Sequence, residues 1–183
     1  MSEQLKQRVS RYISKSSVLE WPEDIVDFDN QSFVVNGIKP LVQVQDDIES
    51  AFVWCWSIKD LFITDLISKN KSVSKKIIEN EINKHVCLTY CADIANRLKH
   101  GELRDSRSGQ FAKLSVVQSI LVNTELTSAI FRLDSKYFIF PKNKDCAKIK
   151  ANVNDENGQF LLDAYTCLHE SLIAWDDIYS KFK

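Results

Sequence analysis

The chain has 183 residues, of which 44% are hydrophobic and 10% aromatic, and it contains only four Gly and three Pro. This composition excludes a disordered chain and favours a globular protein with long helices, because few residues are present that break them. The formal net charge of −1 excludes a polycation, so any contact with nucleic acid has to come from a local basic patch. We expect a single domain over residues 1–183.

The first half of the chain has the apolar periodicity of helices. Residues 2–15 predict a short amphipathic helix. Residues 17–38 contain turn-forming side chains and predict an irregular segment, with a short extended piece at 32–35. Apolar periodicity then predicts one long helix over about 40–68.

A further helix is expected from Ser72 or Ser74, either of which can cap its first turn, to about residue 103. Gly101 lies near the end of this helix and is a possible stop signal. The polar segment that follows predicts a connection over residues 105–109.

The segment after Gly109 is rich in β-branched and aromatic residues. Residues 111–122, 128–140 and 147–153 predict three or four antiparallel strands. Apolar periodicity returns after the Asn157–Gly158 turn and predicts a closing helix.

We therefore expect a mainly α fold, in which a bundle of about four helices carries a small antiparallel β insertion before the last helix. Its parts are a helical part at 1–104, the β insertion at 110–155 and the closing helix at 158–182. The segment 137–140 is apolar on both faces, and residues 52–62 are apolar nearly all round their helix. These surfaces need a cover, either from the helical bundle or from a second subunit, and we expect a homodimer.

The five cysteines are odd in number and show no spacing typical of a disulfide framework. We expect them to be reduced and buried in a cytoplasmic protein. Combinations of these cysteines with nearby histidines lack the loop-borne CxxC spacing of a structural zinc site, so we expect no metal and no cofactor.

The apolar run over residues 51–67 is interrupted by charged residues and is short for a membrane span, so we interpret it as a core helix. The first residues contain no apolar stretch of the kind found in signal peptides. We therefore expect a cytoplasmic protein without a membrane contact.

The segment 93–104 combines polar chemistry with helical spacing. If it is helical, residues at steps of four, three and four share one stripe beside the apolar stripe that faces the core. That second stripe consists of Asp93, Arg97, His100 and Arg104.

The imidazole of His100 can act as a general acid or base near neutral pH, and Asn96 lies one turn earlier, where it can orient the ring or a substrate. Arg97 and Arg104 can hold a phosphate through their guanidinium groups. Between residues 94 and 113, five basic side chains outnumber two acidic ones, a local net charge of +3.

This pattern predicts an anion-binding set of Asp93, Arg97, Lys99 and Arg104, with RNA or a nucleotide phosphate as the ligand. A structural interpretation stays open beside it. In that interpretation His100 is a helix-end residue stabilised by the helix dipole, and Asp93 and Arg97 form a surface ion pair.

The sequence Ala95-Asn-Arg-Leu-Lys-His-Gly101 resembles the Arg-Asn-x-x-x-His-Gly signature of HEPN domains (higher eukaryotes and prokaryotes nucleotide-binding), which are helical bundles. The resemblance covers this motif and the general order of helices around it. It implies that Asn96, His100 and Gly101 occupy the positions of the motif. It also implies that two protomers pair to form a composite site. Many members of that family are metal-independent ribonucleases in toxin–antitoxin and antiphage systems, and others are inactive binding or scaffold modules.

The chain departs from the signature at its first position, where Ala95 replaces the arginine that stabilises the phosphate in the family. We therefore expect a HEPN-like interaction or sensing module, non-catalytic, in a bacterial stress or antiphage defence setting, with a possible protein partner. The alternative is a metal-independent ribonuclease that uses His100 as general acid/base, Asn96 as orienting group, and Arg97 or Arg104 as phosphate clamp.

Overall fold

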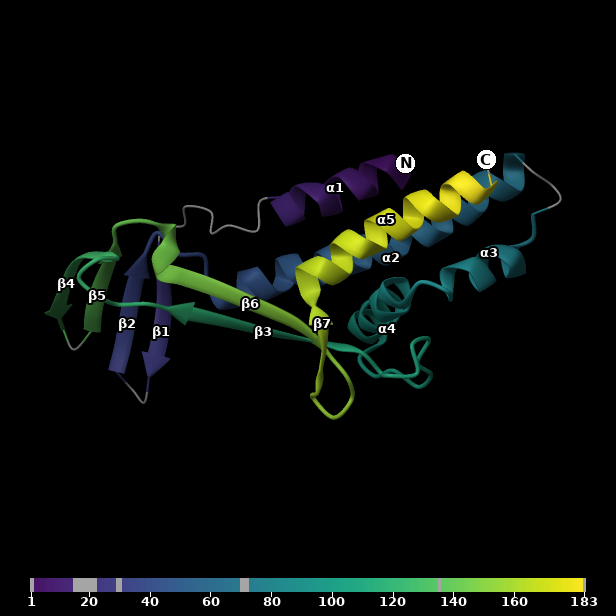
Figure 1. Ribbon diagram of the computed structural model, residues 1–183. Coiled ribbons are helices and arrows are strands. Elements are labelled where there is room, and N and C mark those ends of the chain that lie inside the picture. The colour runs from purple at the N-terminus through teal and green to yellow at the C-terminus, as the bar shows by residue number, and fades with distance from the viewer. Residues whose placement is uncertain (1, 15–22, 29–30, 70–72, 135, 183) are drawn as a thin grey trace. The chain divides into compact units, whose positions relative to one another are not determined.

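The structure is a computed structural model that describes residues 2–14, 23–28, 31–69, 73–134 and 136–182 (Figure 1). Over these residues the chain forms five α-helices and seven β-strands. The helices are α1 (Ser2–Ser14), α2 (Leu41–Lys69), α3 (Lys75–Ile82), α4 (Val86–His100) and α5 (Ala164–Phe182). The strands are β1 (Glu23–Phe28), β2 (Gln31–Asn36), β3 (Lys113–Ile120), β4 (Thr127–Leu133), β5 (Lys136–Pro141), β6 (Ala147–Asn154) and β7 (Phe160–Asp163).

The chain divides into two compact units. The described residues of the first, which we call the helical unit, fall within Met1–Ser14, Ile48–Ser115 and Ala151–Lys183. Those of the second, which we call the sheet unit, fall within Lys15–Asp47 and Val116–Lys150. Each unit is therefore assembled from segments that are distant in the sequence.

The helical unit is organised around α5, which contacts α1, α3 and α4. Figure 1 shows α5 running alongside α2, and the buried Trp175 fixes this contact. Its indole N–H donates to the carbonyl oxygen of Cys55 on α2 at 3.1 Å, and its ring lies 5.8 Å from that of Phe62. An indole needs such a hydrogen bond when it is buried, so this contact determines how α5 packs on α2.

The long helix predicted over about 40–68 is confirmed by α2, within one residue at each end. Within the stretch 52–62, the side chains of Phe52, Cys55, Trp56, Ile58 and Phe62 are buried, so the chain itself covers most of this stretch. The helix predicted from residue 72 to 103 is instead two helices. The chain leaves α3 at the cap residue Asn83, and His85 is extended before α4 begins.

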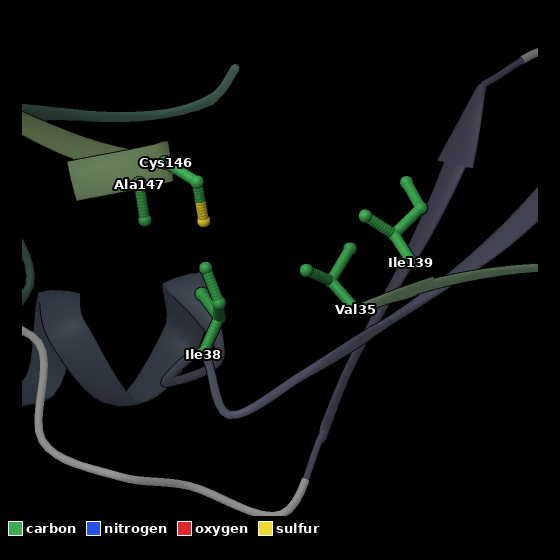
Figure 2. Close-up of a cluster of buried hydrophobic side chains, with 5 residues drawn as sticks. All are labelled: Val35, Ile38, Ile139, Cys146 and Ala147. Carbon is green, nitrogen blue, oxygen red and sulfur yellow. The ribbon is translucent and has the colours of Figure 1, made fainter. Parts of the chain in front are cut away.

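The sheet unit contains a four-stranded sheet in the order β1-β2-β5-β4. The pairs β1–β2 and β4–β5 are antiparallel, whereas β2 and β5 are parallel. Figure 2 shows the core of this unit, where buried side chains from strands and connections meet. This core consists of Val35, Ile38, Ile139, Cys146 and Ala147.

A second sheet has the order β3-β6-β7, and β6 and β7 pair antiparallel. Both β3 and β6 contribute residues to each of the two units. The strands predicted over 111–122, 128–140 and 147–153 correspond to β3, β4 with β5, and β6. The strand β7 occupies the start of the predicted closing helix, so α5 begins at Ala164.

The prediction of a mainly α fold with a small antiparallel insertion before the last helix is wrong, because the described chain is mixed α/β with two sheets. Two strands, β1 and β2, lie before α2, in a segment predicted to be mostly irregular. Their acidic and amide residues resemble loop residues, but pairing with β5 stabilises them as a sheet.

Within the described residues, no helix combines the length and the apolar character that crossing a membrane requires.

The two isoleucines of α5 at positions 178 and 173 provide a test of its packing. Ile178 is fully buried and Ile173 is 43% exposed. We expect Ile178→Ala to lower the free energy of unfolding by about 2–5 kcal/mol, because it leaves a cavity in the core. Ile173→Ala should change it by less than about 0.5 kcal/mol. Urea unfolding followed by circular dichroism measures both, and equal effects would contradict this packing.

Candidate functional site at the C-terminal end of α4

Helix α4 ends where Gly101 predicts that it ends. The Gly101 N–H donates to the carbonyl oxygen of Arg97 at 2.8 Å, and its φ of +80° is a conformation that other residues rarely adopt. The last turn carries the basic residues Arg97, Lys99 and His100, and the positive charges of Arg97 and Lys99 suit the negative end of the helix dipole.

A cavity of about 810 Å³ lies at this end of the helix. Asn96 and His100 both line it, one helical turn apart, together with the segment Gly101–Asp105 that follows the helix. The His100 side chain is exposed and that of Asn96 is half-buried, so both are within reach of a ligand. We call this cavity the α4 recess.

The charges that line the α4 recess are mixed. Arg104 is its one arginine, and Glu102 and Asp105 contribute two carboxylates. The lining therefore has a formal charge of −1 with His100 neutral and of zero with His100 protonated. A phosphate bound in the recess therefore pairs with Arg104, and the two carboxylates reduce the overall attraction for it.

Arg97 does not line the recess. Its Nη2 donates to the carbonyl oxygen of Phe111 at 3.3 Å, so the guanidinium contacts the segment that leads into β3. Its buried Nε has no hydrogen-bond partner among the described residues. This arginine is used in packing the chain after α4.

Asp93 is fully buried, and its carboxylate organises the loop between α4 and β3. The backbone N–H of Arg107 donates to Oδ1 at 2.7 Å. Oδ2 accepts from the hydroxyls of Ser106, at 2.6 Å, and Ser108, and from the N–H of Ala112 at 3.2 Å. A buried carboxylate is tolerated when donors satisfy it in this way, so Asp93 holds the loop in one conformation.

Arg107 extends from this loop to a cluster on α2 and α3. Its Nη1 donates to Asn83 at 2.9 Å, and its Nη2 forms an ion pair with Glu79. The guanidinium lies 5.0 Å from the ring centroid of the buried Trp56, which Lys59 also approaches at 4.8 Å. This arginine counted toward the local charge of +3, but its charge is matched by Glu79.

The structure thus brings together Asn96, His100 and Arg104 around one recess. Lys99 is exposed on the last turn of α4 but is not part of the lining. Asp93 and Arg97 contact the loop after the helix instead. Helical spacing placed Asp93 on the polar stripe, but its role in holding the loop after α4 was not predicted. The signal for that role in the sequence is the Ser106-Arg-Ser108 segment downstream.

Comparison of this chain with protein-family models, with curated proteins and with solved structures gave no match. Of the described residues, no three His, Cys, Asp or Glu side chains come together as a metal site.

The loop anchor can be tested with Asp93→Asn. The amide keeps the shape of the side chain but loses the charge and turns an acceptor into a donor that faces other donors. We expect the free energy of unfolding to fall by about 2–3 kcal/mol, because hydrogen bonds to a charged group are lost. We also expect trypsin to cleave faster after Arg104 and Arg107.

Asp105→Asn is the matched control, because it removes the same charge from an exposed residue of the same loop. It should leave both the stability and the rate of cleavage close to those of the wild type. Equal behaviour of the two variants would show that Asp93 does not anchor the loop.

Proposed function

We propose that this chain is a non-catalytic, HEPN-like interaction or sensing module of the cytoplasm, working in a bacterial stress or antiphage defence setting. We place its ligand contact at the α4 recess. The observation that carries the proposal is the position of Ala95, which is 0% exposed.

Ala95 occupies the place of the arginine that leads the HEPN signature. Because its side chain is in the core of the helical unit, an arginine at this position would be buried rather than directed to a ligand. Arg97 contacts Phe111 and Arg107 forms an ion pair with Glu79, so neither supplies the missing charge. Arg104 does line the recess, but it lies in the segment after α4 and not at the helical position of the signature arginine. A site without its phosphate-binding side chain loses several kcal/mol of transition-state stabilisation, about 3–4 kcal/mol for one such donor.

A ribonuclease remains the second candidate, favoured by the common lining of the recess by Asn96, His100 and Arg104. In that reaction His100 removes the proton from a ribose 2′-hydroxyl, whose oxygen attacks the adjacent phosphorus. The bond from phosphorus to the 5′-oxygen breaks, a 2′,3′-cyclic phosphate forms, and the leaving 5′-oxygen takes up a proton from the protonated His100 or from water. Asn96 orients the imidazole or the substrate, and Arg104 stabilises the charge on the phosphate oxygens.

The two candidates are separated by an RNA assay. We expect single-stranded RNA incubated with the full-length protein to stay intact, and we expect labelled RNA to bind at the recess. Arg104→Ala should weaken this binding at least about tenfold, because a charge-assisted hydrogen bond to phosphate is lost. Gel electrophoresis reports cleavage, and fluorescence anisotropy reports binding.

Lys99→Ala is the matched control for binding, since it removes a basic charge next to the recess but outside its lining. It should weaken binding less than Arg104→Ala does. RNA cleavage that His100→Ala abolishes would overturn the non-catalytic proposal in favour of the ribonuclease. Equal affinity of the wild type and Arg104→Ala for RNA would show that RNA does not bind in the recess.

We also propose that the protein is a homodimer that pairs through the sheet unit. Phe131 on the edge strand β4 stacks on Phe138 and Phe140 of β5, with ring centroids 5.2 and 5.6 Å apart. Phe131 is 47% exposed, and Ile130 and Leu133 of the same strand are exposed as well. An apolar edge strand of this kind favours association with another chain, and a second copy provides a matching surface.

The dimer predicts a specific effect of Phe131→Lys. A charge in the aromatic stack should shift the protein from dimer to monomer, because burying an unpaired ammonium in an apolar interface is costly. Analytical ultracentrifugation measures the change. Val117→Lys is the control, since Val117 is 52% exposed on β3 of the same unit and lies outside the stack. Dissociation by both variants, or by neither, would contradict this interface.

A further inference from the structure

Four of the five cysteines gather in the helical unit, where α2, α4 and α5 meet. The Sγ of Cys91 lies 3.9 Å from the Sγ of Cys55 and 3.3 Å from the Oγ of Ser171. The Sγ of Cys167 lies 3.7 Å from the carbonyl oxygen of Cys87. The remaining cysteine, Cys146, is in the core of the sheet unit.

Helical spacing explains why these groups meet. Cys87 and Cys91 are one turn apart on α4, and Cys167 and Ser171 are one turn apart on α5. Residues four apart lie on the same face of a helix, so the two pairs form facing rows where α4 packs on α5. The sequence pattern showed the first pair, but only the packing of the two helices shows that the second faces it.

Cys87 differs from the other three cysteines of the cluster. Cys55, Cys91 and Cys167 are fully buried, whereas Cys87 is only partly covered. Cys87 is also the second residue of α4, where unpaired backbone N–H groups and the helix dipole stabilise a negative charge. It is therefore the member of the cluster that a small oxidant can reach.

The thiols also differ in acidity. A hydrogen bond from Cys167 lowers the pKa of Cys87, and the same interaction holds the pKa of Cys167 well above its usual range. Burial raises the pKa of Cys91, and the Cys91 thiol together with burial raises that of Cys55. The lowered pKa of Cys87 agrees with its partial exposure, and the buried Cys167 thiol lies beside its backbone.

We propose that Cys87 is a hydroperoxide-reactive thiol and that Cys167 is its resolving partner. The thiolate sulfur of Cys87 attacks one oxygen of the hydroperoxide, and the O–O bond breaks. The departing alkoxide, or hydroxide from hydrogen peroxide, takes up a proton, and Cys87 becomes a sulfenic acid. The sulfur of Cys167 then attacks the sulfur of Cys87, an S–S bond forms, and the hydroxyl of the sulfenic acid leaves as water with the proton of Cys167.

In the whole reaction two thiols are oxidised to one disulfide, and the hydroperoxide is reduced by two electrons to an alcohol and water. The disulfide joins positions 80 residues apart and links the start of α4 to the start of α5. This site is separate in the sequence from the α4 recess, which is formed at the other end of α4. The inference does not depend on the proposed function.

The test uses the full-length, reduced protein treated with hydrogen peroxide and then blocked with N-ethylmaleimide. Peptide mapping by mass spectrometry under non-reducing conditions should find Cys87 joined to Cys167. Before oxidation, limiting N-ethylmaleimide should label Cys87 at least about tenfold faster than Cys146, which is buried and serves as an internal control.

Single variants separate the two roles. Cys87→Ser should remove the fast-labelled thiol and the disulfide, and Cys167→Ser should stop the reaction at a sulfenic acid that dimedone traps on Cys87. Cys146→Ser should behave like the wild type, and circular dichroism checks that each variant is folded. Labelling of Cys87 no faster than Cys146, or a peroxide-formed disulfide between any other pair, would overturn the proposal.

Discussion

The buried carboxylate of Asp93 is the interaction on which the end of α4 depends. A charge removed from water is costly, and this one is tolerated because two hydroxyls and two backbone N–H groups donate to it. All four donors belong to the loop after the helix. Holding that loop also fixes where Arg97 meets the carbonyl oxygen of Phe111, and where Arg107 meets Glu79.

The sequence predicted which side of α4 each site residue faces better than it predicted how deeply each residue is buried. Helical spacing places Asn96 and His100 on one flank of α4, and both line the recess. The same spacing placed Asp93 on that stripe, but it is buried beneath the following loop. Periodicity gives the direction of a side chain from its helix, whereas depth depends on which distant segment packs over it. The local charge was overestimated for the same reason, because the partner of Arg107 is on α3.

The fold was predictable where local patterns determine it. The helix α2 is long and strongly apolar, so its bounds follow from the sequence within a residue. The strands β1 and β2 were not recognised, because their polar residues resemble a loop. They pair with each other, and β2 also pairs with β5, about a hundred residues later. The break between α3 and α4 spans only a single turn, and the apolar pattern of the two helices continues across it. Apolar periodicity therefore did not reveal the break.

The discontinuity of both units has a consequence for biosynthesis. The helical unit needs α5, which is synthesised after α1, α2, α3 and α4, and the sheet unit needs β5 to hold β2. Neither unit can therefore complete its fold until these later segments have been synthesised. Contacts between such distant segments slow folding, and the apolar face of α2 stays open during that time. Apolar surface exposed in this way promotes aggregation until the distant segments have met.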